Sequence, residues 1–220
     1  MSKQKISTRY MAVTAMFCAI SYVLVLLAKV IPNVAGFLSY EPKDVAVVMA
    51  GFILDPAASA IISVIVSFLE MITISTTGPY GFLMNVVSSC AFALPAAFLY
   101  KKHRTQKGAV AGLVAGVLAM AVCMAAWNYI ITPFYMGVPR EQVAGMLIPV
   151  FLPFNLIKGG LNAALTLLLY KPVVGALRKA KLVEESQNGG KKTFKLGFTI
   201  CAAAILVTFI LLFLALLGVL

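Results

Sequence analysis

Three polar side chains interrupt an apolar stretch of the sequence, "PFNLIKGGLNAAL", at residues 153–165. Asn155, Lys158 and Asn162 are spaced three and four residues apart, which places them on one face of a helix. A lysine at membrane depth costs about 2.5–3.5 kcal/mol on insertion scales unless it is paired or reaches water. We therefore expect Lys158 to hold a ligand oxygen, or to pair with Glu70 or Asp44 when no ligand is present.

Two further apolar segments carry amides at a similar depth, Asn85 in one and Asn128, between Trp127 and Tyr129, in the other. Aromatic residues occur at the same ends of these segments: Phe37, Tyr40, Tyr80, Phe82, Tyr135 and Phe154. Aromatic faces, several amides and one ammonium are suited to a flat, polar heterocycle. The alternative is that the amides join helices to one another and Lys158 extends to the membrane interface.

Catalytic and phosphate-binding motifs do not match this sequence. "GGKKTF" fails as a phosphate-binding loop because Lys192 occupies the position that needs Ser or Thr. The only histidine, His103, has no H-E-x-x-H context, and no nucleophile–base pair is evident. We expect a binding protein rather than an enzyme, with no metal site and no cofactor.

The composition indicates an all-α integral membrane protein. The 220 residues are 62% hydrophobic and 11% charged, whereas soluble domains are about half apolar and a quarter charged. Several segments exceed the roughly 18 apolar residues that mark a membrane span, and Asp55-Pro56 separates two helices. The predicted helices cover residues 10–31, 43–54, 56–73, 79–100, 108–132, 148–171 and 196–219, with a loop that contains a short helical turn between the fifth and sixth.

Basic residues predict the orientation. Fourteen of the 18 fall on one side if seven helices alternate: Lys3, Lys5, Arg9, Lys101, Lys102, Arg104, Lys107, Lys171, Arg178, Lys179, Lys181, Lys191, Lys192 and Lys195. Cytoplasmic loops are enriched in lysine and arginine. We therefore expect a cytoplasmic N-terminus and, if the seventh helix spans, a C-terminus outside. The formal charge of +11 then reflects topology and not nucleic-acid binding.

Four stretches carry a family resemblance: "FLSYEPKDVAVVMAGFILDPAASAIISVIVSFLE", "NVVSSCAFALPAAFLYKK", "AAWNYIITPFY" and "VFLPFNLIKGGLNAALTLLLYKP". Together they resemble the riboflavin-specific substrate-binding (S) components of energy-coupling factor (ECF) transporters. The resemblance covers residues 1–180 and implies a six-helix vitamin-binding domain. Residues 181–195 would form a cytoplasmic linker to an additional transmembrane helix at 196–220, which we expect to be a peripheral anchor.

The resemblance implies that riboflavin binds near the outer face, under the loop between the first two helices. It implies no ATPase in this chain, and partners in a bacterial plasma membrane: a membrane coupling (T) subunit and two cytoplasmic ATPases. The predicted ligand-binding residues are Phe37, Leu38, Tyr40, Asp44, Asn85, Asn128, Asn155 and Lys158. An A-x-x-x-A face comprising Ala12, Ala15 and Ala19 would dock on the T subunit.

Two alternatives remain open at this point. An S component for another vitamin, such as thiamine or a folate, would share the fold, although a folate site needs more cations than Lys158 offers. A membrane scaffold without a transported ligand would instead leave the pocket empty.

Overall fold

The computed structural model describes residues 7–183 and 196–219, and helices dominate this part of the chain. The helices are α1 (Thr8–Ala28), α2 (Lys43–Ile53), α3 (Pro56–Thr73), α4 (Gly78–Lys102), α5 (Gln106–Met136), α6 (Arg140–Met146), the π-helical turn η1 (Leu147–Phe151), α7 (Leu152–Lys179) and α8 (Leu196–Leu216). The prediction of an all-α membrane fold is confirmed. Residues 1–6, 184–195 and 220 lie outside the described residues, and so does most of the predicted linker.

Local capping explains why the predicted helix ends are close to the observed ones. The Asp55 carboxylate accepts a hydrogen bond from the Ala58 amide at 2.9 Å, and Pro56 occupies the first helical position. The Thr105 hydroxyl accepts from the Gly108 amide at 3.1 Å at the start of α5. Helix α5 ends at Gly137, whose φ of +66° is the left-handed conformation that glycine adopts without strain.

The region before α7 is the main departure from the predicted helices. Residues 140–146 form the seven-residue helix α6, longer than the short helical turn expected within this loop, and η1 continues it directly into α7. Pro149 lies within η1. Because proline lacks the amide proton that closes an α-helical turn, a wider π turn accommodates it. Helix α7 also extends to Lys179, eight residues beyond the predicted end.

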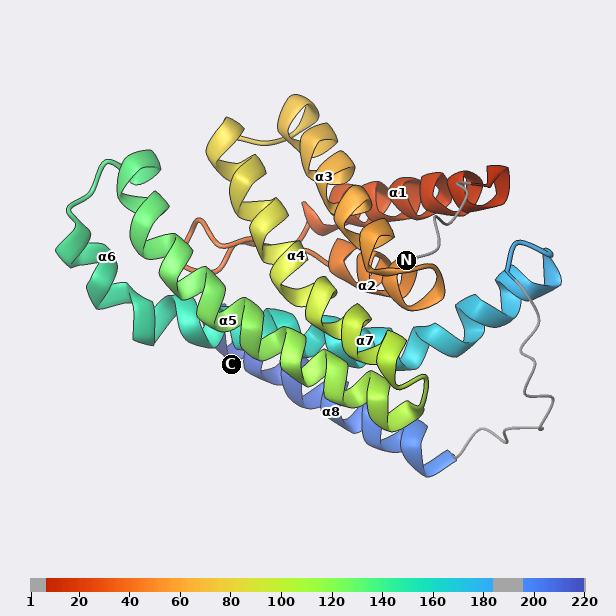
Figure 1. Ribbon diagram of the computed structural model, residues 1–220. Helices are drawn as coiled ribbons and strands as arrows, with labels where there is room; N and C mark the ends of the chain where they lie inside the picture. The colour runs from red at the N-terminus through yellow and green to blue at the C-terminus, as the bar shows by residue number, and fades with distance from the viewer. Residues whose placement is uncertain (1–6, 184–195, 220) are drawn as a thin grey trace.

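The helices pack as a bundle around the short helix α2 (Figure 1). Helices α4 and α5 lie side by side, α7 packs against α5 and α2, and α8 runs along α7. Helix α2 has 11 residues, about 16 Å at 1.5 Å per residue, so it cannot cross a hydrocarbon core of about 30 Å. Within the described residues, six helical segments are long and apolar enough to cross a membrane, with α6, η1 and α7 counted as one.

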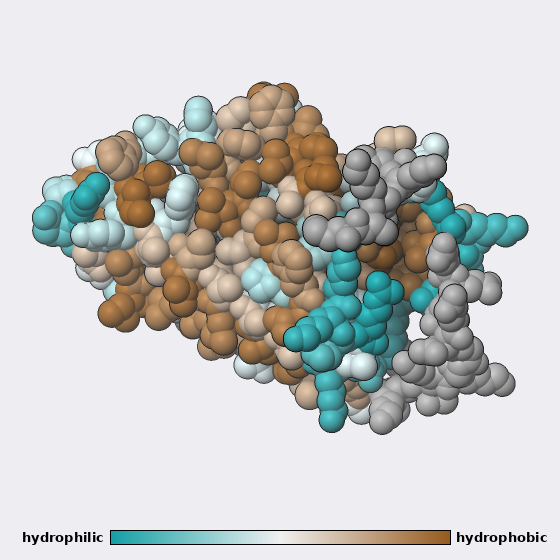
Figure 2. All heavy atoms as spheres, viewed as in Figure 1, coloured by the Kyte–Doolittle hydropathy of each residue, from teal (hydrophilic) through white to brown (hydrophobic). Residues whose placement is uncertain are grey.

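Two polar ends flank an apolar middle. The Arg9 guanidinium donates to the backbone carbonyl of Lys181, and the Tyr10 hydroxyl donates to Asp55 at 3.3 Å. The start of α1, the α2–α3 turn and the segment after α7 therefore share one end of the bundle, here called the basic end. Figure 2 shows hydrophilic side chains gathered at the right-hand end of the visible face and apolar side chains across its middle. The opposite end, which holds the loop of residues 29–42, is called the cavity end.

Candidate functional site

A cavity of about 230 Å³ opens at the cavity end, lined by the 29–42 loop and by helices α3, α4, α5 and α7. Six of the eight predicted ligand-binding residues line it: Phe37, Leu38, Asn85, Asn128, Asn155 and Lys158. They come from segments up to 121 residues apart in the sequence, so the fold, and not sequence proximity, brings them together. Tyr40 and Asp44 do not line this cavity.

A second cavity, of about 330 Å³, lies next to the first. Tyr40 lines it together with residues from the end of α1. The two cavities share six lining residues: Lys29, Asn33, Ser39, Glu41, Glu70 and Thr76. Ligand pockets for drug-sized molecules occupy about 300–1,000 Å³; the first cavity alone is below this range, and the adjoining second cavity adds space beside it. Charged residues border both of them.

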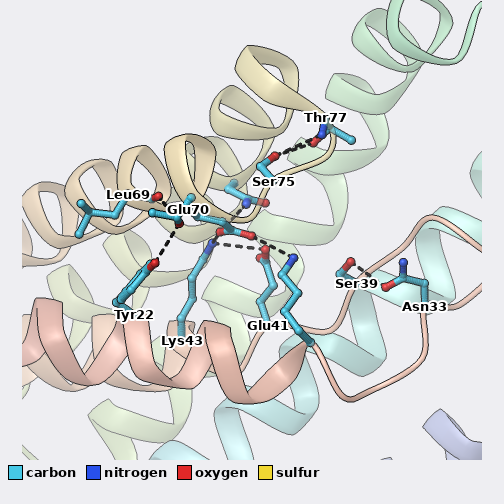
Figure 3. Close-up of polar contacts among 12 residues, drawn as sticks. Tyr22, Asn33, Ser39, Glu41, Lys43, Leu69, Glu70, Ser75 and Thr77 are labelled. Atoms are coloured by element: carbon cyan, nitrogen blue, oxygen red, sulfur yellow. Dashed lines mark hydrogen bonds and ion pairs between the residues drawn. The ribbon is translucent and has the colours of Figure 1, made fainter.

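A chain of alternating charges joins α7, the loop, α2 and α3. The Lys158 ammonium donates to Glu41 Oε2 at 2.9 Å, and Glu41 Oε1 lies 3.3 Å from the Lys43 ammonium. Lys43 in turn donates to Glu70 Oε2 at 2.9 Å, and Lys29 approaches Glu70 Oε1 at 3.7 Å. In Figure 3 the Glu41, Lys43 and Glu70 side chains point toward one another from separate elements.

The predicted internal partners of Lys158 are wrong. Glu41, and neither Glu70 nor Asp44, pairs with Lys158, because Lys43 lies between Glu41 and Glu70 and bonds both. Nor does Lys158 extend to a membrane interface, since it is 5% exposed. Lys43, the first residue of α2, is fully buried. The opposite charges two residues apart in "YEPKD" were the available signal that Glu41 and Lys43 form an ion pair.

The charge state of Glu41 follows from its two lysine neighbours. Burial by itself raises the pKa of a carboxyl group, because the charged form loses its hydration. Around Glu41 the ammonium groups of Lys158 and Lys43 outweigh that effect and lower the pKa to about 2. Glu41 is therefore ionised at physiological pH and forms an ion pair with Lys158.

Asn162 fixes the part of the loop that carries Glu41. Its side-chain amide donates to the Glu41 backbone carbonyl at 3.2 Å, and its Oδ1 accepts from the Tyr40 hydroxyl at 3.0 Å. Asn162 is on the same α7 face as Asn155 and Lys158, as its spacing predicted, but it holds the loop instead of lining the cavity. The polar face of α7 thus contributes to the site in two ways: Asn155 and Lys158 line the cavity, and Asn162 holds the loop.

The loop tip is closed by its own backbone. Val34 and Leu38 exchange hydrogen bonds of 2.9 and 3.0 Å across a turn. Ala35 and Gly36 occupy the turn with positive φ values of 51° and 82°. This conformation places Phe37 and Leu38 in the cavity wall although the segment is neither helix nor strand.

The two buried amides of the cavity bond backbone carbonyls four residues before them, in α5 and in η1. Asn128 donates to the Met124 carbonyl at 2.7 Å and accepts from the Thr132 hydroxyl at 3.0 Å. Asn155 donates to the Phe151 carbonyl at 2.8 Å. A primary amide carries two N–H donors and an oxygen with two lone pairs, so each side chain keeps capacity for a ligand while its orientation is fixed.

Asp44 lies behind the cavity wall. It is fully buried in the first turn of α2, where its Oδ1 accepts a hydrogen bond from the Ser89 hydroxyl. Its Oδ2 has no hydrogen-bond partner among the described residues. The assignment of Asp44 as a ligand contact therefore stays a prediction, without support from the cavity lining.

The predicted docking alanines lie on the outward face of α1. Ala12, Ala15 and Ala19 are exposed, whereas Val13 and Phe17 on the other face are fully buried. Ala12 and Ala15 occupy the half of α1 nearer the basic end, and Ala19 lies at its middle. Their small side chains leave a shallow strip on which another helix can approach closely.

Comparisons with known proteins give a consistent identification. The family model "ECF transporter, substrate-specific component" matches residues 9–170. The Riboflavin transporter FmnP of Bacillus subtilis (strain 168) is 30% identical over 158 residues, which cover 68% of this chain and 83% of that protein. The Riboflavin transporter RibU of Staphylococcus aureus (strain TCH60) is 26% identical over 171 residues, covering 75% of this chain and 90% of that protein.

A solved structure agrees with the sequence relatives. The S component of a bacterial ECF transporter superimposes with a TM-score of 0.66 and 25% identity, covering 77% of this chain and 98% of that chain. The expected role of a substrate-binding transport subunit, and not an enzyme, is confirmed by this family. The chain belongs to the family of substrate-specific components of ECF transporters.

Proposed function

We propose that this chain binds riboflavin in the cavity between the 29–42 loop and helices α4, α5 and α7. The observation that carries the proposal is the convergence of six predicted ligand-binding residues on one cavity. Three relatives that are named riboflavin transporters support this choice of vitamin. The six residues are Phe37, Leu38, Asn85, Asn128, Asn155 and Lys158.

The chemistry of the cavity suits the flavin ring. The isoalloxazine system is flat, with an apolar benzenoid edge and a pyrimidine edge that carries carbonyl oxygens and an N–H group. Asn128 and Asn155 supply both donors and acceptors for the polar edge, and Phe37 and Phe154 supply apolar surface for the ring. Lys158 donates to a ring oxygen, which thereby replaces Glu41 as its partner.

The orientation and partners of the chain belong to the same proposal. The basic end faces the cytoplasm, by the bias of lysine and arginine toward cytoplasmic loops, and the cavity faces outward in a bacterial cell membrane. The N-terminus is then cytoplasmic, and α8 ends outside. The strip of Ala12, Ala15 and Ala19 docks on a membrane T subunit, and two cytoplasmic ATPases supply the energy.

A fluorescence-quenching titration of the purified chain tests the choice of ligand. Riboflavin is expected to bind with one site per chain, whereas thiamine and folate at the same concentrations do not compete. Asn128→Ala is expected to weaken binding, and Tyr129→Ala serves as its matched control, because Tyr129 is the next residue on α5 and is 41% exposed. Competition by thiamine or folate would reassign the vitamin, and equal affinity of the two variants would remove Asn128 from the site.

A further inference from the structure

Helix α8 packs on the bundle through one defined stripe. It lies outside the family match at residues 9–170, and its apolar sequence suggested a peripheral anchor. The residues turned inward are spaced four, three, four and three apart: Ala202, Leu206, Phe209, Phe213 and Leu216. Ala202 and Phe213 are only 3% and 7% exposed, whereas Leu211 and Leu212 between them are about half exposed. This periodicity indicates a specific helix–helix contact.

Gly160 on α7 makes room for that contact. A Cβ atom at Gly160 would lie 2.2–2.6 Å from three carbon atoms of the Phe209 ring. A Cβ atom at Gly159 would instead lie 2.9 Å from Met120 Cε on α5. Glycine is unfavourable in a helix interior, so two consecutive glycines after Lys158 need a structural reason. The missing side chain of Gly159 allows α5 to pack closely, and that of Gly160 allows α8 to do so. Gly160 thereby determines where α8 packs on α7.

The same stripe reaches the loop that covers the cavity. The Phe213 and Tyr40 rings lie 5.5 Å apart between centroids, at an interplanar angle of 55°. Phe213 and Tyr40 belong to one apolar cluster with Val34 and Leu38 of the loop. Tyr40 precedes Glu41, the ion-pair partner of Lys158. Helix α8 therefore contacts the loop between its closed tip and its charged end.

We infer that α8 is a positioning element of the substrate site: Phe209 seats the helix at Gly160, and Phe213 holds Tyr40 and with it the 29–42 loop over the cavity. The inference rests on the proposed riboflavin site for its ligand readout. The Phe213–Tyr40 contact stabilises the closed position of the loop, so the loop opens less often. The contact therefore slows ligand dissociation more than it changes ligand association. Phe209 and Phe213 are thus positioning residues, because neither lines the cavity.

Stopped-flow fluorescence with riboflavin tests Phe213 in the full-length chain. Phe213→Ala is expected to speed dissociation about 3- to 10-fold, the range for loss of an aromatic pair, with an association rate within twofold of the wild type. Phe213→Leu, which keeps apolar bulk without the ring, should give an intermediate dissociation rate. Leu212→Ala, on the lipid-facing side of the same helix, is the matched control and should leave both rates unchanged.

Amide hydrogen exchange of the ligand-free protein gives a readout that is independent of riboflavin. Phe213→Ala should speed exchange in the peptide that spans residues 29–42, while the exchange of α4 and α5 peptides stays at the wild-type rate. Unchanged exchange and dissociation in Phe213→Ala would overturn the inference. Absence of riboflavin binding to the wild-type chain would overturn the proposed ligand alone, because the exchange experiment still tests the loop contact.

The Gly160–Phe209 contact supplies a second test, in which the two substitutions compensate. Gly160→Ala adds a methyl group where the Phe209 ring lies, so it should speed loop exchange and riboflavin dissociation as Phe213→Ala does. Phe209→Ala removes the ring, and the double variant should be no worse than Phe209→Ala alone, because the added methyl group then has space. If the effects of the two substitutions simply add, Gly160 does not seat α8 and the inference fails.

Discussion

Glu41 and the ligand compete for one ammonium group, so removing Lys158 should weaken binding, whereas removing the charge of Glu41 should leave affinity close to that of the wild type. Lys158 donates to Glu41 at 2.9 Å, and both side chains are less than 10% exposed. Lys158→Met removes the donor that we assign to the ligand. Glu41→Gln leaves that donor in place and weakens only its internal partner.

The two substitutions should differ in their effect on riboflavin affinity and in their effect on folding stability. A hydrogen bond from a charged group contributes about 1.5–3 kcal/mol, so Lys158→Met should weaken riboflavin binding about 10- to 150-fold. Glu41→Gln should leave affinity within about threefold of the wild type. Removing one partner of a buried ion pair costs about 3–5 kcal/mol of folding stability. Each single variant should therefore unfold at a lower temperature, and Glu41→Gln less so because glutamine keeps a hydrogen-bond acceptor.

The double variant Glu41→Gln/Lys158→Met separates the two properties. A neutral pair leaves no unpaired buried charge, and Lys43 keeps Glu70 as its partner at 2.9 Å. Stability should thus recover toward the wild type, while affinity stays at the level of Lys158→Met. Thermal unfolding in detergent and fluorescence-quenching titration measure the two quantities on the same samples. If Glu41→Gln loses as much affinity as Lys158→Met, Glu41 contacts the ligand and the competition is wrong.

Three further predictions concern topology, docking and pH. A cysteine at Gly137 should react with an impermeant maleimide from outside intact cells and a cysteine at Gln106 should not; the reverse pattern would invert the proposed orientation. Replacing Ala15 and Ala19 together by leucine should preserve riboflavin affinity but abolish co-purification with the T subunit and uptake, whereas retained assembly would refute this docking face. The pKa of Glu41 is lower in the folded protein than in the unfolded chain, where it is near 4.3. Ionised Glu41 therefore stabilises the fold at pH values above about 4.3, and this contribution is lost as pH falls toward 2. The difference in unfolding temperature between wild type and Glu41→Gln should therefore be constant from pH 5 to 8 and shrink below about pH 4, and a difference that varies between pH 5 and 8 would contradict this assignment.

The sequence predicted those features that local physical chemistry determines. The length of the apolar segments located the helices, and Asp55-Pro56 marked a helix start because a side-chain cap and a proline act over three or four positions. Their positions along the predicted helices placed four residues at a similar depth in the membrane, and these residues line one cavity: Asn85, Asn128, Asn155 and Lys158. These predictions depend on distance along a helix axis, which the sequence contains directly.

Features that depend on loop paths and helix docking could not be predicted in the same way. The predicted partner of Lys158 was wrong because residues 29–42 have no helix or strand periodicity. The path of this loop depends on Asn162 and on a turn with positive φ values. The packing of α8 was missed because leucine, isoleucine and valine surround the helix on all sides, so hydrophobicity alone does not define its inward face. The only sequence signal was Gly160, whose purpose depends on a ring 49 residues away.

The structure of the chain with riboflavin bound is the most direct measurement of the central claim. Our account predicts that the isoalloxazine ring lies between the 29–42 loop and α7, within hydrogen-bond distance of the Asn128 and Asn155 side chains. It further predicts that the Lys158 ammonium has left Glu41 for a ring oxygen. Density for the ring outside this cavity, or a Lys158–Glu41 pair still at 2.9 Å beside a bound ring, would contradict the account.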